Sequence, residues 1–146
     1  MGNNDLTDKI RIGKALLNSL LVLALSFGLF MIPALVKAFR MGFELGPQSD
    51  DPNAVSRTIS DSISEMYQNS ALLITGLILI TILIIFWRAR AVSKGTGNKR
   101  MINGLLVASL PVILSIFWIG GEVGLSDIAV PLLYLGAGIA GGVSNK

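Results

Sequence analysis

The chain has 146 residues, of which 52% are hydrophobic and 14% are charged, and its net charge is +3 at pH 7. This composition is typical of a membrane protein with room for three or four spanning helices, and it excludes a separate soluble domain. The chain contains no cysteine and no histidine, which excludes disulfides and cysteine-ligated metals and removes the commonest general base. We therefore expect a non-enzymatic protein with no catalytic residues, no cofactor and no metal.

The first apolar segment covers about residues 15–38 and follows a polar, basic amino terminus. Its length exceeds the roughly 20 residues that cross bilayer hydrocarbon, so we expect a first transmembrane helix. The small-residue ending at residues 36–38 leaves a second interpretation open, a signal peptide cleaved after Ala38. Because the apolar run is longer than a usual signal-peptide core, we favour a retained helix.

A polar stretch precedes the second apolar segment. Asp51 is suited to be a helix N-cap and Pro52 to occupy the first helical position, so we expect a helix over about residues 52–70. Nothing breaks this helix before the next segment, so we expect it to continue without interruption to about Arg90. Its apolar residues recur at three- and four-residue spacing, which predicts an amphipathic helix: Val55, Ile59, Ile63 and Met66.

The second apolar segment covers about residues 71–88 and contains no charge before Arg88. An uncharged run of this length, rich in leucine and isoleucine, predicts a second transmembrane helix with a cationic end in the headgroup region. Aromatic side chains favour the membrane–water interface. We expect three of them to act as interfacial anchors: Tyr67, Trp87 and Trp118.

Residues 88–100 form a basic turn without an acidic residue. Its cationic excess predicts a cytoplasmic location, while the acidic residues of 41–70 face the other side and both termini are cytoplasmic. This pattern fits a prokaryotic inner membrane or the inner membrane of a viral host. We interpret the cations as topology signals and not as a nucleic-acid surface. Five of them are expected to contact lipid headgroups: Arg88, Arg90, Lys94, Lys99 and Arg100.

The third apolar segment covers about residues 101–121, and a shorter, glycine-rich segment covers about residues 128–143. The third is expected to span the membrane, and the last either spans it or forms a re-entrant segment. A dinucleotide-binding fingerprint in the last segment lacks the acidic residue that should follow about 20 positions later, so we reject it. Small residues let helix backbones approach closely, and we assign helix packing to four of them: Gly138, Gly142, Gly136 and Ala137.

These segments predict an all-α polytopic integral membrane protein with three to four transmembrane helices in a single domain over residues 1–146. The second spanning helix is expected to continue from an extramembrane amphipathic helix. The layout resembles the VirB2-like pilins of conjugation and type IV secretion systems. The residues that carry the resemblance are the polar-to-apolar stretch Asp51 to Trp87, the turn Arg88 to Arg100 and the apolar run Met101 to Gly121. The resemblance implies a helical polymer whose basic turn faces the lumen.

The function favoured by these observations is a structural subunit that packs with copies of itself or with other membrane proteins. The expected partners are the lipid bilayer and other subunits, and no small-molecule substrate is evident. Two alternatives remain open. One is a holin-like protein that permeabilises the membrane, and the other is an accessory subunit of a transporter, respiratory or photosynthetic complex.

Overall fold

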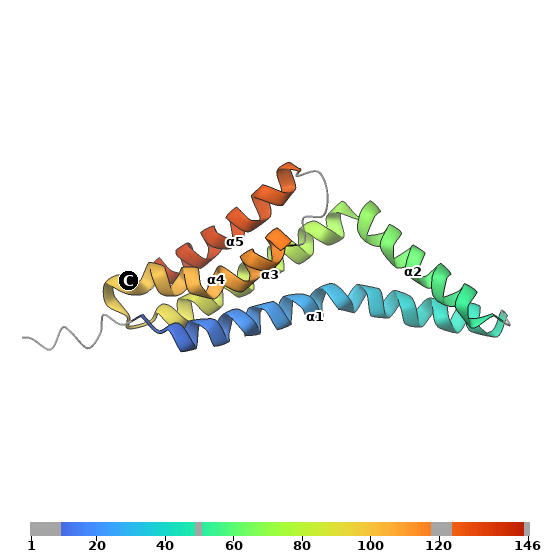
Figure 1. The fold of residues 1–146 in the computed structure, drawn as a ribbon, viewed down its shortest axis with the longest axis horizontal. Helices are drawn as coiled ribbons and strands as arrows, with labels where there is room; N and C mark the ends of the chain where they lie inside the picture. Colours follow the sequence, from blue (N-terminus) through green and yellow to red (C-terminus); the bar gives the residue numbers. More distant parts are fainter. Residues whose placement is uncertain (1–9, 49–50, 118–123, 145–146) are drawn as a thin grey trace, which may run out of the picture. The chain divides into compact units, whose positions relative to one another are not determined.

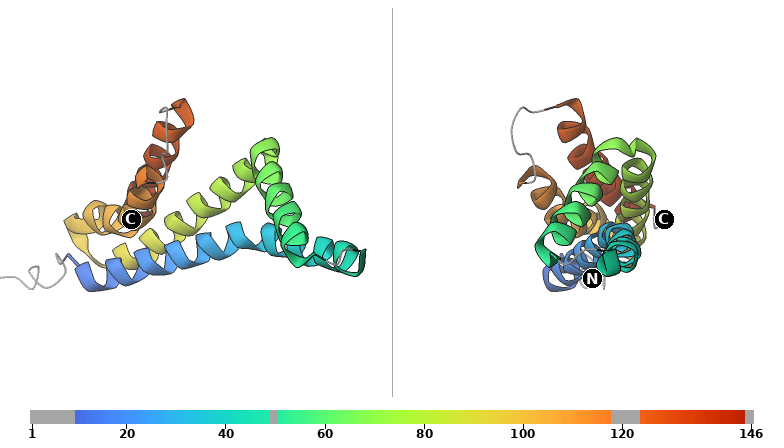
Figure 2. Two further views of the ribbon diagram at one scale, coloured as in Figure 1. Left: turned by 45° about the vertical axis from the view of Figure 1, so that its right-hand side comes forward. Right: turned by 90° about the vertical axis from the view of Figure 1, so that its right-hand side faces the viewer.

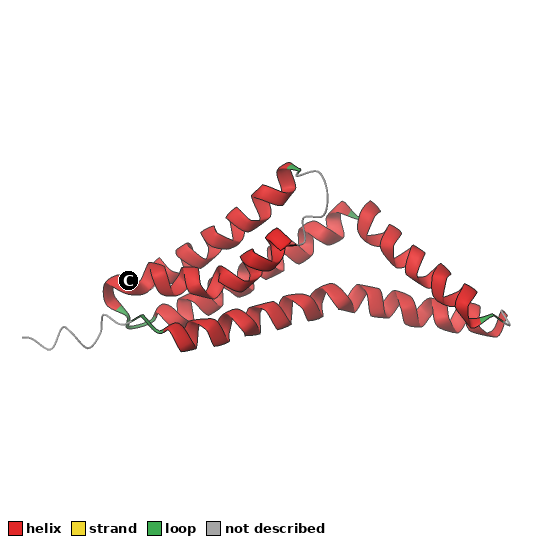
Figure 3. Ribbon diagram, viewed as in Figure 1, coloured by secondary structure: helices red, strands yellow, loops and turns green. Residues whose placement is uncertain are grey.

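The computed structural model describes residues 10–48, 51–117 and 124–144, and every regular element in these ranges is a helix (Figures 1 and 3). The α-helices are α1 (Ile12–Leu45), α2 (Pro52–Asn69), α3 (Ala71–Ser93), α4 (Arg100–Phe117) and α5 (Leu125–Val143). Two short 3-10 helices connect these elements: η2 (Gly46–Gln48) lies between α1 and α2, and η3 (Gly97–Lys99) lies between α3 and α4. The predicted all-α class is confirmed.

Three segments are long and apolar enough to cross a membrane: α1, α3 and Gly97–Phe117. The chain is therefore a polytopic membrane protein. The apolar part of α5, Asp127–Val143, is shorter than these three. The prediction that this last segment spans the bilayer or re-enters it stays a prediction.

Two compact units divide the chain. Unit 1 comprises Met1–Leu25 and Ile78–Lys146, and unit 2 comprises Ser26–Leu77. Both α1 and α3 begin in one unit and end in the other. The predicted single domain over residues 1–146 stays a prediction, and each unit is described by itself.

In unit 1, α4 and α5 form an antiparallel hairpin (Figure 2). The direction follows from the glycine contacts, since Gly142 lies against Arg100 and Gly138 lies against Ala108. The buried core of the unit is built mainly from small and β-branched side chains, which let helices pack closely. It comprises Ala15, Val22, Ile85, Ala89, Val92, Val107, Ala108, Val112, Tyr134 and Ala137.

In unit 2, α2 is the predicted amphipathic helix. Asp51 caps it, because its carboxylate accepts the backbone N–H of Asn53 at 2.9 Å, and Pro52 occupies the first turn. One face of α2 is half-buried and the opposite face is exposed. The half-buried face holds Val55, Ile59, Ile63 and Met66, and the exposed face holds Ser56, Ser60, Asp61, Ser64 and Glu65.

The predicted continuous helix from Pro52 to Arg90 is wrong, because Ser70 interrupts it. Ser70 has φ −105° and ψ 74°, outside the helical region. Its N–H still donates to the carbonyl of Met66, and its own carbonyl accepts from Ile74, so the backbone bonds persist on both sides. Asn69 and Ser70 are both poor helix formers, because their side chains compete for backbone hydrogen bonds. A bend therefore forms without glycine or proline.

Two helices extend beyond their predicted limits. The first apolar segment was expected to end near residue 38, but α1 continues to Leu45, because nothing stops it before Gly46 and Pro47. The second was expected to end near residue 88, but α3 continues to Ser93, so Arg88 and Arg90 are helical residues and not turn residues. The chain then turns at Gly95, whose φ of 72° suits glycine. The last four residues of the predicted 101–121 segment lie outside the described ranges.

Candidate functional site

The first candidate site is the contact between α4 and α5. A Cβ atom placed on Gly138 would lie 2.7 Å from the carbonyl oxygen of Gly104 and 2.9 Å from the Cβ of Ala108. A Cβ on Gly142 would lie 2.6 Å from the carbonyl oxygen of Arg100. Backbone atoms rather than flexible side chains fill these positions, so no larger residue fits without a shift of the helices. Gly138 and Gly142 thus lie in a close contact within the chain.

A second face of α5 packs on α3. A Cβ atom on Gly141 would lie 2.3 Å from the carbonyl oxygen of Phe86 and 3.0 Å from the Cβ of Ala89. Ala137, one turn before Gly141, is buried in the same core. Gly136 takes no part in either contact, because a Cβ placed there would meet no heavy atom within 4 Å.

Sequence reasoning missed Gly104 and Gly141 in these contacts. The signal was present in the chain, since Gly104 and Ala108 are four residues apart, as are Ala137 and Gly141. Unit 1 therefore has three pairs of small residues four positions apart in its helix contacts, and Gly138 with Gly142 is the pair whose two members were both predicted to pack. The spacing alone does not say which pairs face one another, so only the structure assigns Gly104 to Gly138 and Gly141 to α3.

Buried polar side chains link the helices of unit 1. Asn103 is fully buried, and its side-chain oxygen accepts the backbone N–H of Arg11 at 2.8 Å. Ser19 is also fully buried, and its hydroxyl accepts the backbone N–H of Leu110 at 3.1 Å. Leu110 precedes Pro111, which disturbs the hydrogen bonds of α4. A serine on a neighbouring helix commonly satisfies backbone groups near such a proline in lipid.

The basic residues gather at one end of unit 1. The Arg11–Asn103 bond holds the start of α1 beside the start of α4, so the cations of both segments share this end. Ser144, at the C-cap of α5, lies here too, since α5 is antiparallel to α4. The single acidic residue among the described positions of unit 1 is Asp127, which caps the opposite end of α5 by accepting from the N–H of Gly124. The basic end comprises Arg11, Lys14, Arg88, Arg90, Lys94, Lys99 and Arg100.

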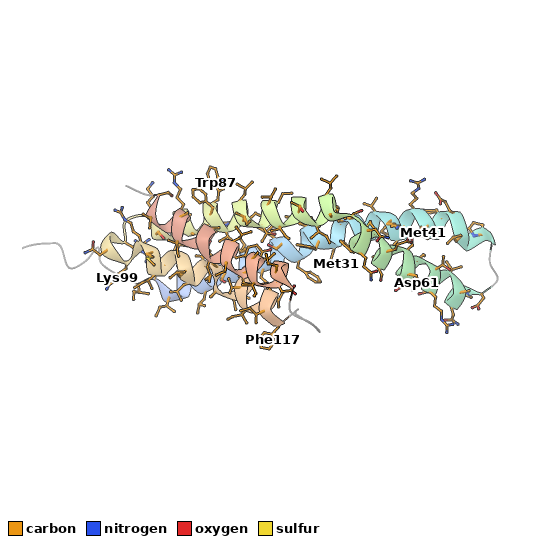
Figure 4. The ribbon with its side chains drawn as sticks, turned by 90° about the horizontal axis from the view of Figure 1, so that it is seen from above. Met31, Met41, Asp61, Trp87, Lys99 and Phe117 are labelled. Carbon is orange, nitrogen blue, oxygen red and sulfur yellow. The ribbon has the colours of Figure 1, made fainter. Side chains whose placement is uncertain are left out.

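Side-chain exposure differs among the five predicted headgroup contacts. Arg90 and Lys94 are exposed, while Arg88, Lys99 and Arg100 are half-buried. Figure 4 shows Lys99 at the basic end. The turn before it is held locally, because the Thr96 hydroxyl donates to the carbonyl of Ser93 and the Ser93 hydroxyl donates to that of Arg100. A fixed turn with outward cations is suited to bind the phosphates of anionic lipids.

The predicted interfacial anchors have different surroundings. Tyr67 belongs to unit 2, where its hydroxyl donates to the carbonyl of Phe30 and ties α2 to α1. Trp87 is 66% exposed and points outward from α3 (Figure 4). Trp118 lies outside the described residues.

Unit 2 holds an open groove of about 580 Å³ between α1 and α2. Lys37 reaches across beside it and donates to the carbonyl of Ser62, while Arg40 pairs with Glu44 at 2.9 Å. No group of three potential metal ligands occurs among the described residues. The groove is lined by Pro33, Val36, Lys37, Arg40, Met41, Glu44 and Met66.

Comparisons with known proteins add nothing to this geometry: no family model, no curated protein and no solved structure matches the chain.

Proposed function

We propose that this membrane protein is a non-enzymatic structural subunit, which packs with copies of itself or with other proteins in a larger membrane assembly. The observation that carries the proposal is the apolar surface of α1 beyond a single span. The helix has 34 residues, which is about 51 Å, against roughly 30 Å of hydrocarbon. Its last turns still expose Phe39 and Phe43, at 68% and 79%. Aromatic side chains left open outside the lipid favour a protein partner.

The glycine contacts exclude one face of α5 as the surface that binds this partner. The sequence predicts that Gly138 and Gly142 serve helix packing, but it does not say whether the partner helix belongs to the same chain or to another one. Both glycines lie against α4 of the same chain, so that face of α5 is occupied. The assembly surface in this proposal is therefore the exposed side of α1.

One assembly that fits this proposal is a pilus-like or secretion apparatus. The pilin-like variant with cleavage after Ala38 would cut α1 within its helix and remove Phe30, whose carbonyl accepts from Tyr67. We therefore propose a subunit that retains its first helix. The mass of the mature chain tests this point, and a product that starts at Phe39 would contradict it.

We also propose that the basic end of unit 1 faces the cytoplasm, with both termini on that side. The chain contains no cysteine, so a single introduced cysteine is the only side chain that a maleimide labels. In intact cells, a membrane-impermeant maleimide should label Ser60→Cys on α2 and leave Ser144→Cys unlabelled until the cells are opened. The reverse pattern would contradict the orientation.

The proposed function is tested by extracting the full chain directly into nanodiscs and measuring the mass of the particle. We expect a particle that holds several protein chains, identified by mass spectrometry as copies of this chain or as other membrane proteins. A lone chain in every particle would contradict the proposal. Abrupt loss of membrane potential upon expression, followed with a potential-sensitive dye, would contradict it too and favour a permeabilising protein.

A further inference from the structure

An apolar seam runs along an exposed face of α1 within unit 2. Its residues recur at spacings of three, four, three and four, which is the heptad pattern of two helices packed in parallel. Exposure rises towards the end of the helix, with 54% for Ile32, 64% for Val36 and 79% for Phe43. The seam comprises Leu29, Ile32, Val36, Phe39 and Phe43.

Two glycines border this seam and make no close contact with the described residues of other elements. Gly28 and Gly42 lie on one edge of it, seven residues before and after Leu35, and a Cβ on either would meet no heavy atom within 4 Å. Glycine inside a helix is destabilising relative to alanine, because it loses more backbone freedom on folding. Gly104 and Gly138 offset this cost by a close backbone contact, whereas Gly28 and Gly42 have no such contact with the residues that the structure describes. Small residues at these positions would let a second helix approach the seam.

The position of the seam along α1 argues against lipid as its occupant. Counted from Ala15, where the apolar segment begins, roughly 20 residues cross the hydrocarbon, so the span ends near Ala34. Val36, Phe39 and Phe43 follow this limit. The same turns carry Lys37 and Glu44 on another face and Arg40 beside the seam, which suits a water-exposed or interfacial segment and not the hydrocarbon.

From these observations we propose that a second copy of this chain docks on the seam, so that two α1 helices pack in parallel. Two copies inserted with the same orientation bring their α1 helices together in the same direction. A two-fold axis along the seam then places each seam residue beside its equivalent. No charge lies within the seam, and Arg40 beside it has its counter-ion, Glu44, in the same chain. Like charges therefore do not oppose the contact.

The exposed area is sufficient for such a contact. A fully exposed phenylalanine presents on the order of 200 Å². On that scale, the open parts of the seam and of Leu35 amount to roughly 600 Å² on each copy, about three quarters of the roughly 800 Å² that each partner of a stable complex buries. The inference rests on the proposed function, since it names the partner and the surface of the proposed assembly.

Cysteine cross-linking in native membranes tests the seam directly. Full-length chains carry a single substitution, Ile32→Cys, Val36→Cys, Phe39→Cys or Phe43→Cys, and are oxidised with copper phenanthroline. A disulfide needs Cα atoms about 4.4–6.8 Å apart, so efficient bonds form only between facing positions. The matched controls are Met31→Cys on another face of α1, and Ser60→Cys and Ser64→Cys on the exposed face of α2. We expect at least fivefold more disulfide dimer at the seam than at the controls, and equal yields at both sets would overturn the docking.

A double variant, Phe39→Gln with Phe43→Gln, gives a second measurement. In nanodiscs it should shift the particle from two or more copies to one, with a dimer dissociation constant raised at least tenfold and the helix content unchanged. If this variant does not fold, the cysteine scan alone decides whether two copies meet at the seam. Particles that hold one copy of the wild-type chain with other proteins would overturn the docking of a second copy and leave the proposed function standing. A wild-type chain alone in its particle would overturn both.

Discussion

Unit 1 and unit 2 bury their side chains to different degrees. All the fully buried polar side chains among the described residues belong to unit 1, together with nearly all the buried apolar ones. In the described part of unit 2, Leu77 is the one buried residue, and α2 has none. Both units expose apolar side chains, but unit 1 also carries its own buried contacts, whereas the described part of unit 2 has almost none. The difference indicates that the internal packing of the described chain depends mainly on unit 1.

The strongest test of this comparison is a larger residue in the α4–α5 contact. Gly138→Val would place side-chain atoms against the carbonyl of Gly104 and the Cβ of Ala108, which both lie under 3 Å from its Cβ. Forcing atoms into a packed core costs about 1–3 kcal/mol and sometimes more, so we expect a loss of about 3 kcal/mol. Unfolding in detergent, followed by circular dichroism, measures it.

Gly136→Val is the matched control on the same helix, because its Cβ would meet open space. We expect this variant to unfold within about 0.5 kcal/mol of the wild type, as exposed substitutions do. Equal losses for both variants would mean that the glycine contact does not stabilise unit 1, and the comparison between the units would fail.

The sequence predicted the helices well because hydrophobic patterning depends on local composition. It placed the amphipathic face of α2 on the correct residues, and Asp51 at the cap, since both follow from spacing and from cap chemistry. It did not predict the bend at Ser70, where two weak helix formers act without glycine or proline. Nor did it predict that α1 passes Lys37 and Arg40, because charges mark the end of a span and not the end of a helix.

The site was predicted less completely, since contacts between helices are not local. Gly138 was chosen from its spacing, but its neighbour Gly104 lies 34 positions earlier and no pattern links the two. Ser19 and Asn103 are similar cases. Each is a polar residue near or within an apolar run, and only the packed structure gives Leu110 and Arg11 as their donors.

A smaller effect is expected from the polar contacts of unit 1. Asn103→Leu would leave the half-buried backbone N–H of Arg11 without its side-chain acceptor, which costs about 1–2 kcal/mol. The same unfolding measurement applies. The control is Asn18→Leu, because the Asn18 side chain bonds to Lys14 within its own helix and needs no other helix. A larger loss for Asn18→Leu than for Asn103→Leu would contradict the interhelical role of Asn103.

Unit 2 has a corresponding polar contact, which tests whether the two units respond separately to a substitution. Tyr67→Phe removes the hydroxyl that donates to the carbonyl of Phe30, at an expected cost of about 0.5–1 kcal/mol. The effect should be local, so hydrogen–deuterium exchange should rise in α2 and stay unchanged in α4 and α5. Gln68→Ala, at the exposed neighbouring position, is the control. Faster exchange in α4 and α5 of the Tyr67→Phe variant would show that the two units do not respond separately.

The smallest effect is expected at the exposed Arg40–Glu44 ion pair of unit 2. Arg40 and Glu44 are one helical turn apart and their side chains are 79% and 58% exposed, so water and salt screen the pair. Glu44→Gln should therefore cost no more than about 0.5 kcal/mol, and the difference from wild type should vanish in 0.5 M salt, on the order of a 4 Å screening length. Unfolding at two salt concentrations measures it. A loss above 1 kcal/mol that persists in salt would contradict the weak, screened character of this pair.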